Sequence, residues 1–384
     1  MSKKILFVFH NNFLNKHIGC NAYIYEITKF VKSLGFQVDY FSTTRIWNNF
    51  ENFDELNKEN NNLIDNLYLC KCKRKRKIYK GSLINKNAHY DWFRWEDAKY
   101  FNKIINENNY DFINMHYIQC SELLNYGTKI PTKTKLIYTQ QDSWFTQCFF
   151  RDRNISKMFD EAKFEFEAMK KFDVVTSISN DEKLFYEKFF NNQKFYFLPH
   201  FLKLNLLPNT TKDIDVLFLA HNNPYNLEAA LWLAKNVVPQ LPNDIKLTIC
   251  GKVWEEIDKL SEKEKSLFIN VTRINFAPNL NDLYAKTKIA VVPMFGGTGM
   301  KIKTIDALSR GIPVIATPLG VDGFPDKNEN GCIVTDNPNE FTKNVIELVY
   351  NEQFYNTTRD RCIDYFKKYL SLEANKKKLI EIFS

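Results

Sequence analysis

The chain has 384 residues, 44% of them hydrophobic, with 53 Lys and Arg against 45 Asp and Glu. This length is too great for one ordinary core, so two domains are expected. The net charge of +8 suits a polyanionic ligand or an anionic membrane surface. It does not by itself indicate nucleic acid, which we do not expect as a partner. The eight cysteines form no Cys-x-x-Cys pair, which argues against zinc ribbons and thioredoxin chemistry.

The first half of the chain alternates strand and helix patterns. An apolar run at 5–9 leads through a loop containing Gly19 to a helical repeat from about 22 to 34. Gly35 is placed to end this helix. Further strands are predicted at 36–41, 112–116, 136–139, 174–179 and 195–199. This alternation predicts a parallel, doubly wound α/β sheet.

A second α/β series follows residues 200–213, which show no periodic element and are interpreted as a linker. Strands are expected at 216–220, 247–250 and 275–277, and helices at 228–236 and 281–286. The tail, at 341–350 and 357–383, has the apolar spacing of amphipathic helices.

The most informative pattern lies at residues 289–317. A short apolar run ends in the loop Gly296-Gly297-Thr298-Gly299, a helical stretch follows, and a second β-rich run begins at 312. Glycines let backbone N–H groups approach a ligand closely. The start of a helix attracts phosphate through its unpaired N–H groups and its dipole. The alternative interpretation is an ordinary α/β crossover without a ligand.

Two lysines and a carboxylate follow this loop. Lys301 and Lys303 bring positive charge to the first turn of the predicted helix. Asp306 lies one turn further along, where a carboxylate is placed to accept hydrogen bonds from ribose hydroxyls. Together with the glycines, these residues predict a site for a nucleotide diphosphate.

The segment resembles the C-terminal donor-binding motif of the retaining glycosyltransferases of group 1, or family 4. Their pattern is Pro, Gly-x-Gly, a basic residue, an acidic residue followed by Ala, then Gly-x-Pro-Val and a closing Gly. Many members carry two glutamates, at the places of Thr298 and Asp306. The first carboxylate is therefore absent here, as it is in a branch with Gly-x-Gly-x-Lys-x-Lys, which the chain resembles more closely.

This resemblance implies the GT-B fold, in which two Rossmann-like, doubly wound α/β domains face each other across a cleft. It implies an acceptor-binding domain at 1–205 and a nucleotide-sugar donor domain at 206–370. A last helix, at about 370–384, is expected to pack back on the first domain.

The resemblance also implies roles for residues that follow other strands. His116 is expected to touch the donor sugar and Asp142 to be a carboxylate at the cleft. Gly19 would let the first loop approach the sugar and phosphate, and Gly251 would let the nucleobase pack on backbone. Asn222 lies where many members place basic residues that hold pyrophosphate. The alternatives are a buried structural histidine, a helix N-cap at Asp142 and plain turn glycines.

Asp213 and Asp215 match an Asp-x-Asp metal motif of another glycosyltransferase fold. They come at the start of a predicted strand, whereas ligands of open α/β sheets bind beyond the carboxyl ends of strands. We therefore expect no metal and no other cofactor.

Residues 71–77 hold six cations in seven positions. Such a run is either a contact with an anionic membrane or a solvated loop. The aromatic residues that follow are either an acceptor platform or a core-facing stripe: Tyr90, Trp92, Phe93, Trp95, Tyr100 and Phe101.

The leading functional interpretation is a retaining glycosyltransferase. It would take a nucleotide-diphosphate sugar as donor and a glycan or lipid-linked acceptor, in cell-surface polysaccharide or glycoconjugate synthesis. The alternatives are a sugar-nucleotide epimerase or phosphorylase of the same fold, and a non-catalytic partner subunit. The apolar run at 5–9 is too short for a signal peptide core, and no apolar run of about 18 residues follows. We expect a cytoplasmic protein, with peripheral contact at the inner membrane face.

Overall fold

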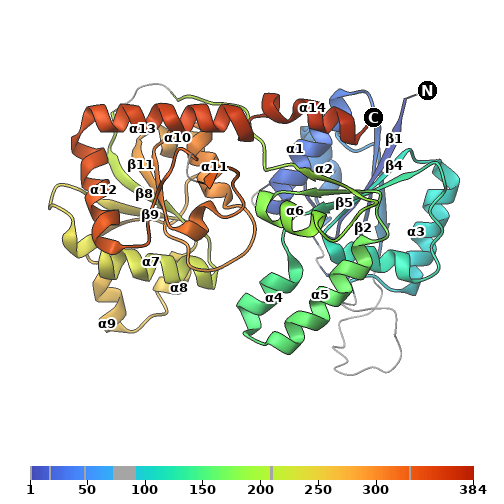
Figure 1. Ribbon diagram of the computed structural model, residues 1–384, viewed down its shortest axis with the longest axis horizontal. Helices are drawn as coiled ribbons and strands as arrows, with labels where there is room; N and C mark the ends of the chain where they lie inside the picture. Colours follow the sequence, from blue (N-terminus) through green and yellow to red (C-terminus); the bar gives the residue numbers. More distant parts are fainter. Residues whose placement is uncertain (1, 17–18, 47–48, 72–91, 208–210, 328–329) are drawn as a thin grey trace. The chain divides into compact units, whose positions relative to one another are not determined.

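The computed structural model describes residues 2–16, 19–46, 49–71, 92–207, 211–327 and 330–384. They form two compact units. Unit 1 comprises Met1–Ile178, Glu182–Leu198 and Lys378–Ser384, and unit 2 comprises Ser179–Asp181 and Pro199–Lys377. Each unit is built around one parallel sheet with helices beside it (Figure 1). The predicted α/β class with two Rossmann-like sheets is confirmed.

The sheet of unit 1 has the strand order β3-β2-β1-β4-β5-β6-β7. Its strands are β1 (Lys4–Val8), β2 (Gln37–Thr43), β3 (Asn66–Cys70), β4 (Phe112–His116), β5 (Lys135–Gln140), β6 (Val174–Ser177) and β7 (Lys194–Phe197). Its helices are α1 (Gly19–Ser33), α2 (Phe53–Glu59), α3 (Trp95–Asn108), α4 (Trp144–Asp152), α5 (Ile155–Met169) and α6 (Asn180–Glu187), with a 3-10 helix η1 (Ile118–Asn125). Helix α6 begins in unit 2 and continues in unit 1.

The apolar residues of the central strands explain this sheet. Strand β1 is buried from Ile5 to Val8 and pairs in parallel with both β2 and β4. Gly35 ends the first helix with a φ of +83°, as its position after α1 predicts. Because all pairings are parallel, the carboxyl ends of β1, β4 and β5 meet at one edge of the sheet.

The sheet of unit 2 has the order β10-β9-β8-β11-β12-β13. Its strands are β8 (Ile214–Leu219), β9 (Leu247–Cys250), β10 (Val271–Ile274), β11 (Thr287–Val292), β12 (Val314–Ala316) and β13 (Ile333–Val334). Its α-helices are α7 (Pro224–Asn236), α8 (Trp254–Ile257), α9 (Glu262–Lys265), α10 (Leu280–Ala285), α11 (Ile302–Ser309), α12 (Pro338–Tyr350) and α13 (Glu352–Tyr365). Short turns are η2 (Val238–Gln240), η3 (Ser266–Phe268), η4 (Pro318–Val321) and the π-helical η6 (Phe366–Leu370).

The strand expected at 275–277 is wrong, because the structure has β10 four residues earlier. This edge strand exposes Thr272 and Arg273, so its apolar signal is weak. Helix α14 (Leu372–Ile382) spans the division at Lys377, and its last residues belong to unit 1. No helix among the described residues combines the length and the apolar character needed to cross a bilayer.

Candidate functional site

The glycine loop predicted from the sequence joins β11 to α11 in unit 2. Strand β11 lies inside the sheet, between β8 and β12. Within the loop, Gly297 has a φ of +90° and Gly299 a φ of +68°. L-amino acids with side chains adopt such angles only with strain, so glycine is needed at both positions. The loop therefore turns sharply at the carboxyl end of a central strand, where open α/β sheets bind ligands.

Gly296 is required for a different reason, the close approach of an aromatic ring. A Cβ atom on Gly296 would lie 2.4 Å from Cδ1 of Tyr225. Tyr225 belongs to the first turn of α7, which follows β8. The glycine loop and the start of α7 thus pack against each other, because β8 and β11 are neighbours.

Lys301 is folded into the glycine loop. Its Nζ donates hydrogen bonds to the carbonyl oxygens of Gly297 at 3.3 Å, Thr298 at 3.3 Å and Gly299 at 2.9 Å. The residue is also the N-cap of α11, and it is only 9% exposed. Its ammonium group therefore holds the curved loop together and places a positive charge at the start of the helix.

Lys303 lies two residues further along, in the first turn of α11. Its Nζ donates to Oδ1 of Asn226 at 2.7 Å and lies 4.6 Å from the ring centroid of Phe218. Burial, followed by the nearby charge of Lys301, lowers the pKa of Lys303 to about 7. Asn226 is buried, and its Nδ2 donates to the His221 carbonyl at 2.9 Å. The sequence analysis missed Asn226, since nothing in the local pattern of α7 indicates a lysine partner.

Backbone donors complete this site. The N–H groups of Gly297, Gly299 and Met300 donate to no backbone acceptor within the described part of the chain. Free N–H groups in a glycine loop that opens a helix are suited to phosphate oxygens. With two ammonium groups beside them, they form a binding site for an anion with several oxygen atoms.

Asp306 lies on α11, and its carboxylate pairs with an arginine. Its Oδ1 accepts a hydrogen bond from Nη1 of Arg310 at 3.2 Å, and Nη2 of Arg310 also donates to Asn281 at 2.9 Å. Burial raises the pKa of Asp306, and the guanidinium of Arg310 opposes that shift. Because Arg310 already donates to Oδ1, the predicted hydrogen bonds from ribose hydroxyls would be accepted by the other oxygen of the Asp306 carboxylate.

Replacing Asp306 by Asn is expected to weaken nucleotide binding about 10-fold, because an amide keeps the shape and loses a charge-assisted hydrogen bond. Isothermal titration with UDP, and with UDP lacking both ribose hydroxyls, checks this. Wild type should favour UDP and Asp306→Asn should not discriminate. Equal binding of the two nucleotides by wild type would show that the carboxylate has another role.

Two further residues predicted for the donor lie after β8 and β9. Gly251 has a φ of +123°, and a Cβ atom there would lie 2.2 Å from the carbonyl oxygen of Ala220. Glycine is therefore required for the backbone of this turn to pass the end of β8. Asn222 donates to Glu255 at 2.9 Å. The contacts of these two residues are separate from those of Lys301 and Lys303.

In unit 1, His116 lies at the end of β4 and is fully buried. Its ring stacks on Phe7 with centroids 5.6 Å apart. Burial lowers its pKa to about 3, so the imidazole is neutral at physiological pH. Neither ring nitrogen has a hydrogen-bond partner among the described residues.

Asp142 follows β5, and the alternative interpretation as a helix N-cap is wrong because Ser143 is the N-cap of α4. Burial raises the pKa of both Cys20 and Tyr117, and the negative charge of the Asp142 carboxylate raises each of them further. Cys20 is next to Gly19, the first residue of α1. The structure thus brings the start of α1, the end of β4 and the end of β5 together around Tyr117.

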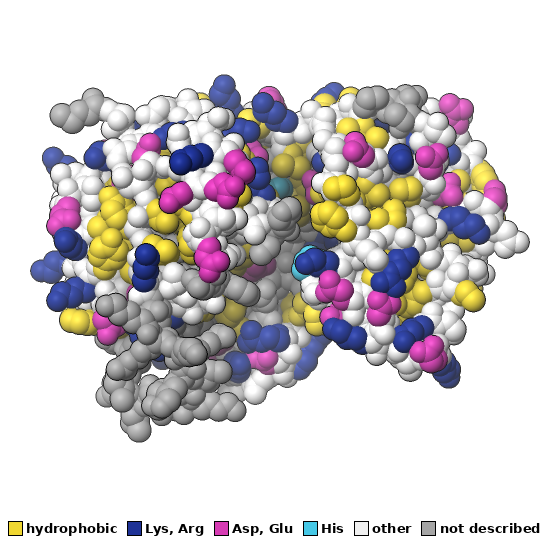
Figure 2. Space-filling model, turned by 180° about the vertical axis from the view of Figure 1, so that it is seen from behind, with side chains coloured by type: hydrophobic (Ala, Val, Ile, Leu, Met, Phe, Trp, Pro, Cys, Tyr) yellow, Lys and Arg dark blue, Asp and Glu magenta, His cyan; other side chains and the backbone are white. Residues whose placement is uncertain are grey.

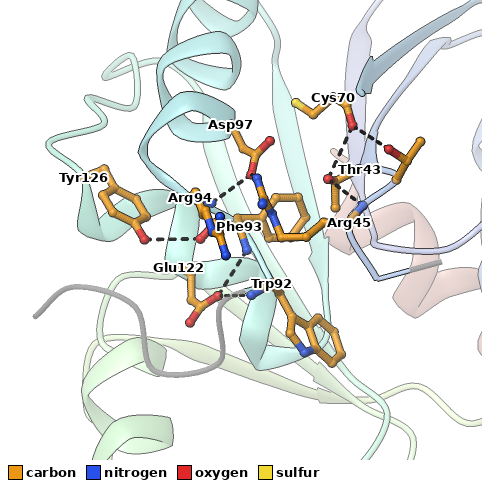
Figure 3. Close-up of polar contacts among 10 residues, drawn as sticks. Thr43, Arg45, Cys70, Trp92, Phe93, Arg94, Asp97, Glu122 and Tyr126 are labelled. Carbon is orange, nitrogen blue, oxygen red and sulfur yellow. Dashed lines mark hydrogen bonds and ion pairs between the residues drawn. The ribbon is translucent and has the colours of Figure 1, made fainter. Parts of the chain in front are cut away.

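The segment that precedes α3 is held by two carboxylates (Figure 3). Glu122 is fully buried and accepts hydrogen bonds from the N–H groups of Trp92 at 3.0 Å and Phe93 at 3.3 Å. Asp97 accepts the N–H of Arg94 at 2.8 Å and pairs with Nη2 of Arg45 at 2.7 Å. These hydrogen bonds therefore hold residues 92–97 in place within unit 1.

The aromatic residues of this region divide between core and surface. Phe93 and Phe101 are fully buried in the core of unit 1, whereas Trp95 is 56% exposed. Tyr90 and the cationic positions 73–77 lie outside the described residues, so the structure does not test the predicted basic contact.

The Asp-x-Asp pair has a structural role at its second residue. Asp215 accepts the backbone N–H of Lys246 at 3.0 Å, where β8 begins beside β9. Among the described residues, no three His, Cys, Asp or Glu side chains cluster closely enough to hold a metal ion.

The fold is that of the GT-B glycosyltransferases. TarM of S. aureus, in complex with UDP and alpha-GlcNAc-glycerol, aligns with a TM-score of 0.71 at 13% identity over 100% of both chains. Sucrose-phosphate synthase from Thermosynechococcus elongatus aligns with a TM-score of 0.69 at 14% identity, over 99% of this chain and 98% of that one. HepE from Anabaena, in complex with UDP-glucose, gives 0.67 at 13% identity over 99% of each chain.

Within unit 2, residues 213–351 match the family model described as "Glycosyl transferases group 1". An uncharacterized 44.6 kDa protein in the cps region of Klebsiella pneumoniae is 28% identical over 145 residues. That match spans 36% of this chain and 37% of the relative's length.

Proposed function

We propose that this protein is a glycosyltransferase that moves a sugar from a nucleotide-diphosphate sugar to a glycan or lipid-linked acceptor. The observation that carries this proposal is the glycine loop of unit 2, where N–H groups that have no backbone acceptor among the described residues lie beside Lys301 and Lys303. A diphosphate leaving group gains negative charge as the sugar departs. Fixed N–H dipoles and ammonium groups stabilise that charge more than they stabilise the bound donor, which is what lowers a barrier.

The finer parts of the proposal are retention of the anomeric configuration and a role in surface polysaccharide synthesis. Retention requires attack from the face that the leaving group vacates, so the departing phosphate itself is placed to take the acceptor proton. His116 and Asp142 are proposed to act on the sugar and acceptor in that step. The cps relative and the UDP-sugar complex of HepE support this choice of donor and pathway.

The proposal is tested in two steps. A thermal-shift panel of UDP-, GDP-, ADP-, CMP- and dTDP-sugars identifies the donor, since a ligand at 100 times its Kd stabilises by about 2.7 kcal/mol. Incubation with that donor and candidate acceptors, followed by proton NMR of the anomeric signal, then gives the product. We expect an acceptor-dependent product with the donor's configuration. Conversion of the donor without any acceptor would instead favour an epimerase or phosphorylase.

Turnover is expected to survive chelation. In the proposed mechanism the two lysines and the start of α11 neutralise the leaving diphosphate without a cation, which the contacts of Lys301 with the loop support. Initial rates with and without about a tenfold excess of EDTA over protein measure this, with an added MnCl₂ arm to test restoration. A rate abolished by EDTA and restored by Mn²⁺ or Mg²⁺ would show that the charge is neutralised by metal.

Peripheral contact with an anionic membrane at the cytoplasmic face is also part of the proposal, and it rests on the six cations of residues 71–77. On the face drawn in Figure 2, basic and acidic side chains are mixed rather than gathered into one basic surface. Attraction to anionic lipid contributes about 1 kcal/mol for each cation near the bilayer. Six cations near the bilayer would therefore supply most of the free energy of binding to an anionic membrane.

We expect wild-type protein to sediment with vesicles containing phosphatidylserine and to remain in solution with neutral vesicles. The test variant changes Lys73, Arg74, Lys75 and Arg76 to Gln, and its control changes the exposed Lys170, Lys188, Lys376 and Lys377 to Gln. Only the first should abolish sedimentation. Equal loss in both variants would mean that net charge, not this run, attracts the protein.

A further inference from the structure

The first turn of α4 comes directly after Asp142, at the carboxyl end of β5, and it does not cap itself. Ser143 is the N-cap residue, yet among the described residues its side chain makes no capping hydrogen bond. Its Oγ lies instead 3.0 Å from the Tyr186 hydroxyl and 2.8 Å from Oγ1 of Thr146. The N–H groups at the start of a helix have no partner within the helix. The acceptors for α4 therefore come from other parts of unit 1.

Two acidic side chains from neighbouring helices supply these acceptors. Glu165 of α5 accepts the N–H of Trp144 on Oε1 at 3.3 Å and the N–H of Phe145 on Oε2 at 3.1 Å. Glu182 of α6 accepts the N–H of Ser143 at 3.2 Å. Negative charge at the start of a helix is also favoured by the helix dipole. The two carboxylates thus take the place of the missing N-cap.

Glu165 is the central group of this arrangement, because both of its oxygens serve as acceptors. The residue is fully buried, and no Lys, Arg or His among the described residues pairs with it. A buried carboxylate without a cationic partner is costly for folding unless hydrogen bonds offset the cost. Here the offsetting donors are the N–H groups that begin α4, immediately after Asp142. The buried charge is therefore directed at the backbone that carries the Asp142 side chain.

The surroundings of Glu165 determine its protonation. Burial raises the pKa of Glu165 to about 7, although the two backbone N–H groups of α4 oppose that shift. The titratable groups around it are acids, hydroxyls and a thiol: Glu161 on α5, Tyr138 on β5, Tyr186 and Glu182 on α6, Asp142 before α4, and Cys120 of η1 beside Tyr138. Burial raises the pKa of the two tyrosines and of the cysteine well above their usual ranges, so these three groups stay protonated.

Protonation changes what Glu165 is able to accept. An ionised carboxylate has acceptor lone pairs on both oxygens, whereas a protonated carboxyl group has an O–H donor on one of them. That O–H would face a backbone N–H, so one of the two hydrogen bonds at the start of α4 would be lost. The remaining bond would also be weaker, because a charged acceptor binds an N–H more strongly than a neutral one. The first turn of α4 is therefore held firmly only while Glu165 is ionised.

We propose that Glu165 is a positioning residue, whose ionised carboxylate holds the first turn of α4 and thereby the Asp142 side chain for sugar transfer. The role of Asp142 in transfer rests on the function proposed above, whereas the coupling of Glu165 to α4 rests on unit 1 alone. Glu165 is fully buried and acts through the backbone of α4.

This arrangement gives stability and turnover opposite responses to pH. The pKa of Glu165 is about 7 in the folded protein, against the usual value of 4.5. Between these values the folded protein binds more protons than the unfolded chain. The free energy of unfolding contributed by Glu165 therefore falls as the pH rises through this window. Turnover should instead rise with pH through about 7, as Glu165 becomes ionised.

The test variant is Glu165→Gln, which keeps the shape of the side chain and leaves one oxygen as acceptor. The control is Glu161→Gln, one turn earlier on α5, because the indole N–H that Glu161 accepts from Trp144 at 3.1 Å is also accepted by an amide oxygen. At pH 8 we expect hydrogen–deuterium exchange of residues 143–147 to be about 10-fold faster in Glu165→Gln than in wild type, and unchanged in Glu161→Gln. At pH 5.5, where wild-type Glu165 is protonated, wild type and Glu165→Gln should exchange equally.

The second measurement is the pH profile of kcat at saturating donor and acceptor. Wild type should lose turnover on the acidic side with an apparent pKa of about 7. Glu165→Gln should lack this acidic limb, and its kcat at pH 8 should be at least about 10-fold lower because Asp142 is misplaced. Its KM for the donor should be unchanged, since the glycine loop belongs to unit 2. Glu161→Gln should keep the wild-type profile.

The results separate this role from a purely structural one. Equal exchange in wild type and folded Glu165→Gln at pH 8 would overturn the proposal, and so would faster exchange with an unchanged acidic limb. If Glu165→Gln does not fold, wild type alone provides the test. Its protection at residues 143–147, corrected for intrinsic exchange, should fall about 10-fold from pH 8 to pH 5.5, and constant protection would contradict the proposal. A pH-dependent start of α4 in a protein that transfers no sugar would leave the coupling standing and count against the proposed glycosyltransferase.

Discussion

Donor turnover is expected to fall at least 1000-fold when Lys301 and Lys303 are both replaced by Ala. Removing one preorganised donor from a charge-stabilising site typically costs about 2.7–4 kcal/mol of transition-state stabilisation, and this variant removes two ammonium groups. Lys303→Met alone should account for about 100-fold of the loss. Lys301→Ala acts through the loop as well, because its Nζ bonds three loop carbonyls.

The pH dependence of Lys303 gives this prediction a second measurement. The free protein holds Lys303 at a pKa of about 7, and a bound diphosphate favours the charged form. Donor binding should therefore take up a proton near neutral pH and weaken as the pH rises above about 7. Calorimetry in two buffers of different ionisation enthalpy measures that uptake, and Lys303→Met should abolish it.

The pKa of Lys303 also determines whether the free energy of unfolding rises or falls with pH. An unfolded lysine has a pKa of about 10.4, so between about pH 7 and 10.4 the unfolded chain binds more protons than the folded protein. The free energy of unfolding contributed by this group rises across that window, and the cost of burying the charge is fully present below it. Lys303→Met should thus be at least as stable as wild type at pH 6, although its turnover is about 100-fold lower. Lys235→Met, which changes an exposed residue of α7, is the control and should alter neither property.

Replacing Gly297 by Ala is expected to destabilise the protein by about 1–3 kcal/mol and to weaken donor binding at least 10-fold. The φ of +90° at Gly297 is unfavourable for alanine, so the loop must distort or remain strained. Gly35→Ala is the matched control, since Gly35 has a φ of +83° and a Cβ atom added there would meet no described atom within 4 Å. It should cost similar stability and leave nucleotide affinity unchanged. Urea unfolding and nucleotide titration of the two variants separate strain from function.

Gly296 permits a rescue experiment at the same loop. Gly296→Ala places a methyl group against Cδ1 of Tyr225, 2.4 Å from the ideal Cβ position. We expect Gly296→Ala to lose both stability and nucleotide affinity, and the double variant with Tyr225→Ala to regain part of each. A double-mutant cycle measures this coupling. Simple addition of the two effects would show that the ring and the loop are not in steric competition.

Local chemistry explains how much of unit 2 could be predicted. A glycine loop between a strand and a helix is encoded by adjacent residues, so the loop, α11 and the positions of Lys301 and Lys303 are readable from the sequence. The partner of Lys303 is not, because Asn226 lies 77 residues away and meets it only through the pairing of β8 with β11. Tyr225 is hidden for the same reason.

In unit 1 the sequence predicts the strands but not which residues meet at their carboxyl ends. Its strands follow from apolar runs, yet the residues gathered at its carboxyl edge have no motif in common. His10 and Trp92 come together only because β1 lies next to β4 and because Glu122 holds the segment before α3. Glu165 meets the first turn of α4 from a position about 20 residues further along the chain. These contacts are long-range, so a pattern of neighbouring residues does not contain them.

The division of the chain between the units has a consequence for synthesis on the ribosome. Residues 378–384 belong to unit 1, although they follow the whole of unit 2 in the sequence. Phe383 is 3% exposed and packs edge-on against Phe112 at 5.9 Å, and Lys378 donates to the Phe197 carbonyl at 3.0 Å. While unit 2 is being translated, the ring of Phe383 is therefore not yet available to pack on Phe112. Unit 1 acquires its last layer only after unit 2 has been translated, so chaperones have longer access to the earlier-made half than its position in the gene suggests.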